Sequence, residues 1–236
     1  MAEGVKALVF DVFGTVVDWR SSIIADLEAF GRAKHIKADW VGLTDAWRAG
    51  YQPAMDRVRK GELGWTHIDT LHRMVLDELL AKFKITGLSE ADKDHVNKVW
   101  HRLHGWPDAT EGLTRLKRKF IISTLSNGNT SLLVNMAKHA GLPWDCVLSA
   151  ETFKAYKPDP RAYLGAAEVL GLKPGEVMMT AAHNSDLVAA SKQGLRTAFV
   201  ARPTEYGPHQ TRDFKAEHDF DVVATDFIDL AKKLGV

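Results

Sequence analysis

The stretch KALVFDVFGTVVD, residues 6–18, contains four apolar residues, Ala7 to Phe10, followed directly by Asp11. Four consecutive apolar residues are typical of a strand that is buried on both faces of a sheet. A carboxylate at the end of such a strand, with Phe13 two residues later, needs a chemical explanation. The residues that follow the other predicted strands provide it.

Length and charge limit the kind of protein this is. The chain has 236 residues, which fits one folded core with an insertion better than two full domains. Lys and Arg number 31 and Asp and Glu number 30, so the net charge is +1. This balance argues against nucleic acid and against a charged membrane surface as partners.

The sequence also favours the cytoplasm as the location. Cys146 is the single cysteine, so no disulfide can form within the chain. The first residues, MAEGVKALVFDV, lack the apolar run of a signal peptide, and no stretch approaches the roughly 18 apolar residues of a membrane helix. We therefore expect a soluble cytoplasmic protein.

Short apolar runs alternate with stretches of helical pattern through most of the chain. This alternation predicts an α/β fold, in which helices cover both faces of a Rossmann-like parallel sheet. The predicted strands are Val5–Phe10, Phe120–Leu125, Cys146–Leu148, Val177–Thr180, Thr197–Val200 and Val222–Ala224. The predicted helices between them include Thr130–His139, Pro160–Leu170 and Asp186–Gln193.

Residues 19–106 interrupt this alternation. They contain no convincing strand, and apolar residues such as Leu71, Val75 and Leu79 recur at helical spacing. Six of the seven tryptophans lie here, at positions 19, 40, 47, 65, 100 and 106. We predict an all-helical cap domain at 19–106, inserted into a core domain made of residues 1–18 and 107–236. Most of the tryptophans should pack inside the cap, and some should line its contact with the core.

Polar residues follow four of the predicted strands. Ligands bind at the carboxyl ends of parallel strands, so these residues should converge at one edge of the sheet. Each taken alone has an ordinary structural explanation, such as a helix cap for Ser126, a surface charge for Lys157 or a first-turn helix acid for Asp186. Their occurrence at equivalent ends of successive strands favours a shared site. The residues concerned are Asp11, Thr15, Ser126, Asn127, Lys157, His183 and Asp186.

Asp11 has the surroundings expected of a nucleophile. Gly14 fits a tight turn that brings backbone N–H groups near Asp11. Those donors, together with Lys157, would keep the carboxylate ionised and directed. An ionised, positioned carboxylate that faces a cleft is a candidate nucleophile.

These residues resemble the haloacid dehalogenase superfamily over nearly the whole chain. The matching motifs are DVFGT at 11–15, LSNG at 125–128, KPDPRAY at 157–163 and the acidic end of HNSD at 183–186. In that superfamily the first aspartate is the nucleophile. Most members are magnesium-dependent phosphatases, in which a second aspartate, two residues later, protonates the leaving group.

Two departures separate this chain from the phosphatases. Phe13 holds the place of the second aspartate, and a phenyl ring cannot transfer a proton. Ala182, four residues before Asp186, holds the place of a magnesium ligand, and magnesium needs oxygen ligands. A halide is a leaving group that needs no proton. The pattern therefore resembles the metal-free L-2-haloacid dehalogenase branch, which implies neither a metal nor another cofactor.

This resemblance implies a role for each residue. Asp11 would attack the carbon that bears the halogen and form an ester, which water then hydrolyses to give a 2-hydroxy acid of inverted configuration. The other assignments are Phe13 for the pocket, Thr15 for the nucleophile loop, Ser126 and Asn127 for the substrate carboxylate, Lys157 beside the nucleophile, Tyr163 near the site, and Asp186 for positioning Lys157 or the water.

Arg48, in the stretch AWRAGYQ at 46–52, matches the halide-binding arginine of the family. A guanidinium is permanently charged and weakly hydrated, which suits a pocket where negative charge develops. Its place in the sequence between Trp47 and Tyr51 favours this role over that of an exposed cap arginine.

The loop before Asp186 departs from the family pattern of a serine, an asparagine and an aromatic residue. The matching positions hold Ala181, His183 and Ser185. An imidazole can donate a hydrogen bond, so His183 could assist the water or the departing halide, or it could simply pack at the start of a helix. We hypothesise that His183 extends the substrate range to small haloacetates, including fluoroacetate.

Three functions follow from these observations. The first is a hydrolytic dehalogenase that acts on small L-2-haloalkanoic acids or haloacetates. The second is a small-molecule phosphatase of the same fold, against which Phe13 and Ala182 argue. The third is a non-catalytic scaffold, which would predict the loss of the site residues. Members of the family are often homodimers, and the apolar residues of the cap allow either a homodimer or a monomer.

Overall fold

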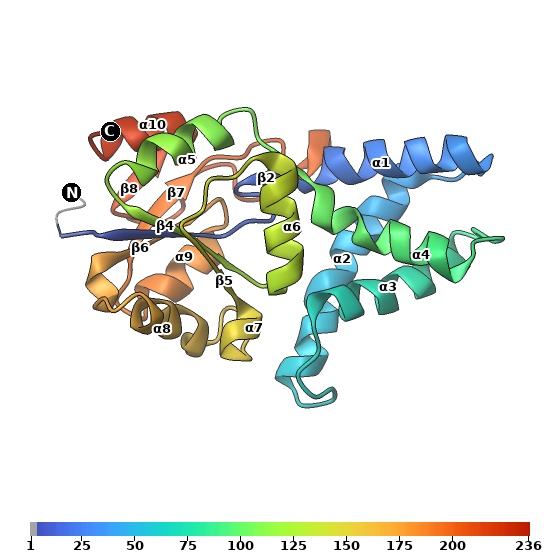
Figure 1. Ribbon diagram of the computed structural model, residues 1–236, viewed down its shortest axis with the longest axis horizontal. Helices are drawn as coiled ribbons and strands as arrows, with labels where there is room; N and C mark the ends of the chain where they lie inside the picture. The colour runs from blue at the N-terminus through green and yellow to red at the C-terminus, as the bar shows by residue number, and fades with distance from the viewer. Residues whose placement is uncertain (1–3) are drawn as a thin grey trace.

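The computed structural model describes residues 4–236 and has the α/β fold expected from the sequence (Figure 1). Six parallel strands form the central sheet in the order β5-β4-β1-β6-β7-β8. Their bounds are Ala7–Phe10 for β1, Ile121–Ser126 for β4, Cys146–Ser149 for β5, Val177–Ala181 for β6, Arg196–Val200 for β7 and Val222–Ala224 for β8. All six strands predicted from the sequence are therefore confirmed, with ends that differ by no more than two residues.

Helices cover both faces of this sheet. Their bounds are Ala109–Lys117 for α5, Thr130–Ala140 for α6, Ala150–Phe153 for α7, Pro160–Val169 for α8, Asn184–Ser191 for α9 and Phe227–Lys233 for α10, with single 3-10 turns at Pro174–Glu176 and Gly207–His209. The three predicted helices correspond to α6, α8 and α9. Helix α9 begins two residues before the predicted start, so Asp186 lies within its first turn.

The alternation of side chains along β1 divides the core into two layers. Leu8 and Phe10 belong to the apolar cluster that includes α5 and α10, whereas Ala7 and Val9 belong to the cluster that includes α8 and α9. Figure 1 shows the first pair of helices above the sheet and the second pair below it. Successive residues of a strand point to opposite faces, so the uninterrupted apolar run of β1 fits a strand that is covered on both faces.

Helices also fill the segment between two short strands, β2 and β3. The bounds are Val17–Asp18 for β2, Trp19–Lys34 for α1, Trp40–Arg59 for α2, Ile68–Lys82 for α3, Glu90–Asn97 for α4, Lys98–Arg102 for a 3-10 helix and His104–Gly105 for β3. The two strands pair antiparallel, so the chain leaves the sheet and returns to it side by side. They were not predicted, because two residues are too few to show a periodic pattern.

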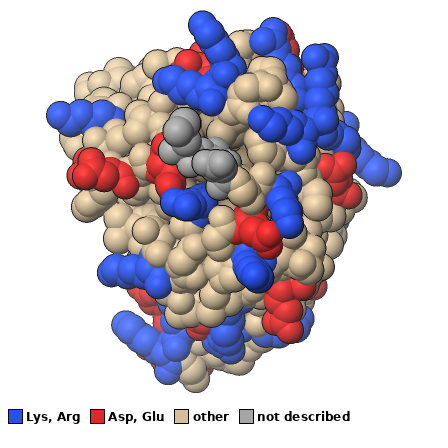
Figure 2. All heavy atoms as spheres, turned by 90° about the vertical axis from the view of Figure 1, so that its left-hand side faces the viewer, with Lys and Arg blue, Asp and Glu red and all other residues tan. Residues whose placement is uncertain are grey.

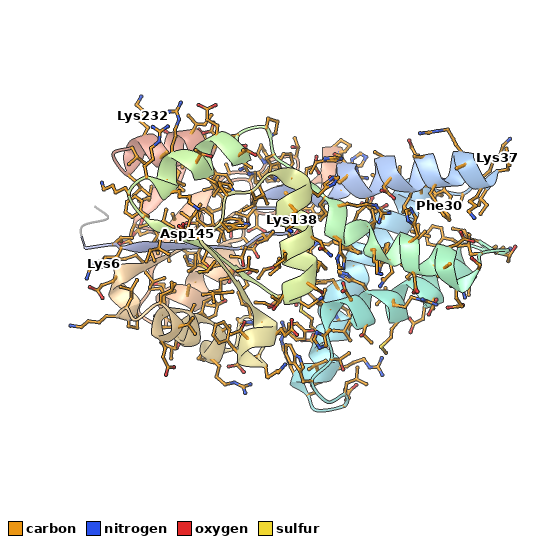
Figure 3. All side chains as sticks on the ribbon, in the orientation of Figure 1. Lys6, Phe30, Lys37, Lys138, Asp145 and Lys232 are labelled. Atoms are coloured by element: carbon orange, nitrogen blue, oxygen red, sulfur yellow. The ribbon has the colours of Figure 1, made fainter. Side chains whose placement is uncertain are left out.

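The inserted helices extend away from the carboxyl ends of the strands. Figure 3 shows Phe30 and Lys37 near the outer end of this segment, far from Lys6 at the start of β1. None of the helices within residues 4–236 has the length and apolar character needed to cross a bilayer. On the opposite face, where β1 begins, Figure 2 shows Lys and Arg side chains interspersed with Asp and Glu, as the balanced net charge of +1 suggests.

Trp100 connects the inserted helices to the loop after β1. Its ring stacks on Trp19, with the ring centroids 6.4 Å apart, and meets the ring of Trp47 edge to face at 5.6 Å. Phe13 from the core meets Trp100 edge to face at 5.6 Å, and Trp106 donates a hydrogen bond to the Gly14 carbonyl at 2.8 Å. Trp100 and Trp106 thus pack the segment between β2 and β3 against the loop after β1.

His72 of α3 lies inside this aromatic cluster. It is 1% exposed, and its ring stacks on Trp100 with the centroids 4.2 Å apart. Neither ring nitrogen has a hydrogen-bond partner within the described residues. Burial lowers the pKa of His72 to about 3, so the folded protein holds the ring neutral.

His72 should make the protein less stable in acid. The unfolded chain takes up a proton below the ordinary pKa of 6.5, whereas the folded chain does not, so stability is full above this pH and falls below it. A histidine with this pKa shift lowers the free energy of unfolding by about 2 kcal/mol when the pH falls from 7 to 5. We expect His72→Phe to lose that much less stability over this interval, as measured by urea unfolding at both pH values. The exposed His209→Gln is the control, and an equal loss in His72→Phe and wild type would contradict this.

Candidate active site

A cavity of about 490 Å³ lies at the carboxyl ends of the strands, next to helix α2. Parallel strands direct their carboxyl ends to the same edge of a sheet, so the loops after β1, β4 and β6 meet there. Eight of the ten residues predicted for the site line this cavity, whereas Thr15 and Ser126 do not. The eight are Asp11, Phe13, Arg48, Asn127, Lys157, Tyr163, His183 and Asp186.

Asp11 follows β1 directly, is 8% exposed, and has different partners at its two carboxylate oxygens. Its Oδ1 accepts a hydrogen bond from Lys157 Nζ at 3.0 Å. Its Oδ2 accepts one from Thr15 Oγ1 at 2.9 Å and lies 3.0 Å from His183 Nδ1. Burial alone would raise the pKa of Asp11, but Lys157 and His183 outweigh it and hold the pKa well below its usual range. Asp11 is therefore ionised, and Oδ1 has fewer partners than Oδ2.

Lys157, in the loop before α8, bridges two carboxylates. Its ammonium lies 3.0 Å from Asp11 Oδ1 and 2.5 Å from Asp186 Oδ2. Burial would lower the pKa of Lys157, but Asp11 and Asp186 raise it, so the lysine is charged. Its backbone N–H donates to Asn127 Oδ1 at 2.8 Å, and the Tyr163 hydroxyl donates to Asp186 Oδ1 at 2.6 Å. The lysine and its second carboxylate are thus both held in place.

Ala182 stands at the position that the family resemblance assigns to a magnesium ligand in the phosphatases, and it makes a backbone hydrogen bond there instead. Ala182 is 1% exposed, and its N–H donates to Thr15 Oγ1 at 2.9 Å, which orients the hydroxyl toward Asp11. Within residues 4–236 no group of three or more His, Cys, Asp or Glu side chains is arranged to hold a metal ion. The two carboxylates that a cation could use, Asp11 and Asp186, already share Lys157.

His183 connects Asp11 to a buried carboxylate, Glu205. Its Nε2 lies 2.9 Å from Glu205 Oε2, and Glu205 is 1% exposed and accepts a hydrogen bond from Trp19 Nε1 at 3.1 Å. Burial would lower the pKa of His183, but Glu205 and Asp11 raise it well above its usual value. Burial would raise the pKa of Glu205, but His183 and Arg48 lower it. His183 is therefore a charged partner of two carboxylates rather than a residue that only packs at a helix start.

Sequence reasoning did not identify Glu205. It follows strand β7, so it obeys the same placement rule as the predicted residues, but it is the fifth residue after the strand end and no motif marks it. Its approach to the nucleophile loop depends on Gly14. A Cβ atom at Gly14 would lie 2.0 Å from Glu205 Oε1, and Gly14 has a φ of +86°, a conformation that favours glycine.

Arg48 of α2 is a buried cation at the same cavity. Its side chain is 13% exposed, and its guanidinium lies over the rings of Tyr51 at 4.7 Å and Trp19 at 5.4 Å. Trp47, its neighbour in the sequence, points elsewhere and donates to the His72 carbonyl at 2.9 Å. Arg48 Nη2 lies 4.0 Å from Glu205 Oε1, and Arg48 Nε is buried without a hydrogen-bond partner in the described residues. The interpretation of Arg48 as an exposed cap arginine is therefore wrong.

Phe13 and Ser126 take different positions at the site. Phe13 lines the cavity, is 3% exposed, and meets the ring of Tyr51 edge to face at 6.2 Å. Ser126 is 1% exposed, and its Oγ accepts a hydrogen bond from the Gly128 N–H at 3.2 Å. Ser126 thus shapes the loop behind the cavity, and its predicted contact with a substrate carboxylate stays a prediction.

Comparison with known proteins agrees with this geometry. A sequence model of the haloacid dehalogenase-like hydrolases matches residues 5–191. The (S)-2-haloacid dehalogenase 4A of Burkholderia cepacia is 32% identical, and the match covers 87% of this chain and 88% of the relative.

Two solved structures are more similar still. The crystal structure of an L-2-haloacid dehalogenase is 51% identical, with a TM-score of 0.95 and 98% of each chain covered. That of a defluorinating L-2-haloacid dehalogenase is 48% identical, with a TM-score of 0.96, and the match covers 98% of this chain and 96% of the other. Because the family match spans most of the sequence and includes the loops that carry Asp11, Lys157 and Asp186, this chain belongs to the haloacid dehalogenase-like hydrolase family.

Proposed function

We propose that the protein is a hydrolytic dehalogenase that acts on small L-2-haloalkanoic acids or haloacetates. It converts them to 2-hydroxy acids and halide through an ester at Asp11, and it needs no metal ion. The observation that carries this proposal is the ionised Asp11, buried beside Lys157 in a cavity where Phe13 replaces the acid of a phosphatase. The substrate class is taken from the relatives named (S)-2-haloacid and L-2-haloacid dehalogenase.

In the first step, Oδ1 of Asp11 attacks the carbon that bears the halogen. The new carbon–oxygen bond forms as the carbon–halogen bond breaks, and the electron pair of that bond leaves with the halide. Attack opposite the halogen inverts the configuration of the carbon. Lys157 and Thr15 hold the carboxylate in one orientation, and such positioning can lower a barrier by about 7–11 kcal/mol at most.

Arg48 receives the halide. Its guanidinium is fixed over Tyr51 and Trp19, and Nε has no partner among the described residues, so one buried N–H is available to an anion. A buried donor without a partner costs free energy, and the departing halide would satisfy it. A fixed cation in a pocket of low dielectric also stabilises the charge that develops on the halogen.

Asn127 holds the substrate carboxylate. Its Oδ1 already accepts the Lys157 N–H at 2.8 Å, which leaves the Nδ2 hydrogens as donors at the cavity wall. Tyr163 and Asp186 act through Lys157, since the tyrosine hydroxyl fixes the carboxylate that fixes the ammonium.

In the second step, water attacks the carbonyl carbon of the Asp11 ester. The ester carries no charge, so His183 loses one of the two carboxylates that hold its proton, releases the Nδ1 proton to solvent and can then act as a base through Nδ1, which faces Asp11. Glu205 accepts the Nε2–H and fixes the ring. His183 takes one proton from the water and returns it to the alcohol oxygen as the ester bond breaks. The second proton of the water returns to His183 Nδ1 when Asp11 ionises again, so each turnover releases one proton in all.

The remaining expectations form part of the same proposal. We propose that residues 19–106 form the cap domain and that 1–18 and 107–236 form the core domain, with the paired β2 and β3 at the junction. A cytoplasmic location is supported by the single free cysteine, Cys146. A homodimer is supported by the family resemblance, and sedimentation would measure it.

Asp11→Asn should abolish halide release from L-2-chloropropionate, because an amide oxygen is a poor nucleophile. We expect wild-type activity to persist in EDTA and the variant to lose activity by roughly a thousandfold or more. Asp45→Asn, which removes an exposed carboxylate on α2, should behave as wild type. Activity that disappears in EDTA, or hydrolysis of p-nitrophenyl phosphate with magnesium but no halide release, would overturn the proposal.

His183→Gln should leave the first step and impair the second. We expect one equivalent of halide per enzyme to be released in a burst, followed by turnover that is slower by about a hundredfold or more, because the base is missing. Intact-protein mass spectrometry should then show the ester on Asp11. Glu205→Gln should show the same pattern to a smaller degree. A parallel loss of burst and turnover, with no adduct, would refute the assigned role.

His183→Ala should also narrow the range of halogens. Fluoride is the halide that most needs hydrogen bonds, so the ratio of the fluoroacetate rate to the chloroacetate rate should fall. The relevant measurement is fluoride and chloride release under single-turnover conditions. If the ratio is the same in the variant and in wild type, His183 does not assist the departing halide.

A further inference from the structure

The charged groups deep in the cavity are paired with one another. They comprise three carboxylates and three cations, which are Asp11, Asp186, Glu205, Lys157, Arg48 and His183. Every one of these cations lies beside at least one carboxylate. The inner cavity therefore presents little net positive charge to an anion that approaches from solvent.

The segment 202–213, called the strap below, supplies a further cation. The strap is held at both ends, because Arg202 Nε donates to the Thr15 carbonyl at 2.9 Å and Asn184 Nδ2 donates to Asp213 Oδ1 at 2.9 Å. Between these points the Gln210 side chain is buried and bonds to backbone atoms on both sides of it. The strap is thus a well-anchored segment that forms part of the cavity wall.

Arg212 of the strap lines the cavity and is exposed to solvent, so it lies where the cavity opens. Its guanidinium lies over the Tyr206 ring at 4.4 Å, and Gln210 Nε2 donates to the Arg212 carbonyl at 2.9 Å. Within residues 4–236 no carboxylate forms an ion pair with Arg212. The adjacent carboxylate, Asp213, accepts two hydrogen bonds from Asn184.

We propose that Arg212 selects anionic substrates by binding the carboxylate of an incoming haloacid at the cavity entrance. A stacked guanidinium presents a rigid pair of donors that matches a carboxylate. Although Asp213 also lines the cavity, no described carboxylate forms an ion pair with Arg212, so its guanidinium attracts anions from solvent at a rate that ionic strength controls. Arg212 acts before the chemistry and touches neither the carbon under attack nor the halogen. This inference rests on the proposed dehalogenase function.

The test compares Arg212→Gln with Arg118→Gln, which removes the same charge elsewhere on the surface. Arg118 is exposed in the turn between α5 and β4, next to the start of β4 and therefore at the edge of the sheet away from the cavity. For Arg212→Gln we expect kcat/KM on L-2-chloropropionate to fall by about tenfold at low ionic strength, with kcat unchanged. The difference from wild type should shrink as ionic strength rises, and Arg118→Gln should match wild type. An unchanged kcat/KM, or a fall in kcat alone, would overturn the proposal.

A second measurement separates this inference from the proposed function. Propionate has no leaving group, so its affinity for the Asp11→Asn protein reports carboxylate binding without chemistry. Adding Arg212→Gln should weaken propionate binding by about tenfold, as measured by calorimetry, and Arg212→Lys should restore part of it. Equal affinities with and without Arg212 would refute the role of this residue even if halide release were confirmed. Conversely, if the protein released no halide but bound propionate through Arg212, only the proposed dehalogenase function would be refuted.

Discussion

The ion pair between Asp11 and Lys157 is the contact on which the rest of this structure depends. Both groups are almost fully buried, and a buried charge is costly unless it is paired and hydrogen-bonded. The pairing continues outward on one side through His183 to Glu205 and Arg48. Charges of opposite sign therefore alternate along a chain of contacts that ties β1, the loop after β6, the strap and helix α2 together. Removing an internal member would take one charged partner away from each of its neighbours.

In the mechanism proposed above, this alternation lets one site run two different steps. In the resting protein, Lys157 and His183 both favour the ionised form of Asp11, which is the form that attacks carbon. In the proposed first step, ester formation removes the negative charge between the two cations, and the halide carries this charge away towards Arg48. His183 then faces a neutral ester while Glu205 still holds its other nitrogen. The same pair of contacts thus supports a nucleophile first and a base afterwards, and no added general acid is needed for the halide.

The sequence predicted those parts of the structure that repeat or that follow a positional rule. The six strands were recognised because buried parallel strands are nearly continuously apolar. Strand ends converge, which brings Asp11, Asn127, Lys157, His183 and Asp186 to the cavity, whereas Phe13, Arg48 and Tyr163 were predicted from the family resemblance. The two-residue strands β2 and β3 were missed because they are too short for any pattern. Glu205 was missed because its importance depends on a tertiary contact, namely the space above Gly14. The aromatic partners of Arg48 are Tyr51, which the sequence indicated, and Trp19, which it did not, whereas the adjacent Trp47 points elsewhere. Contacts between distant segments leave no local signal.

The central claim is that Asp11 forms a covalent ester which water opens at the aspartyl carbonyl. It is tested most directly by a single turnover with excess enzyme in water labelled with oxygen-18, followed by mass spectrometry of both the product and the peptide that contains Asp11. The account predicts an unlabelled 2-hydroxy acid and one labelled oxygen in the Asp11 carboxylate. Labelled 2-hydroxy acid in that first turnover, with an unlabelled Asp11 peptide, would show direct attack by water and would contradict it.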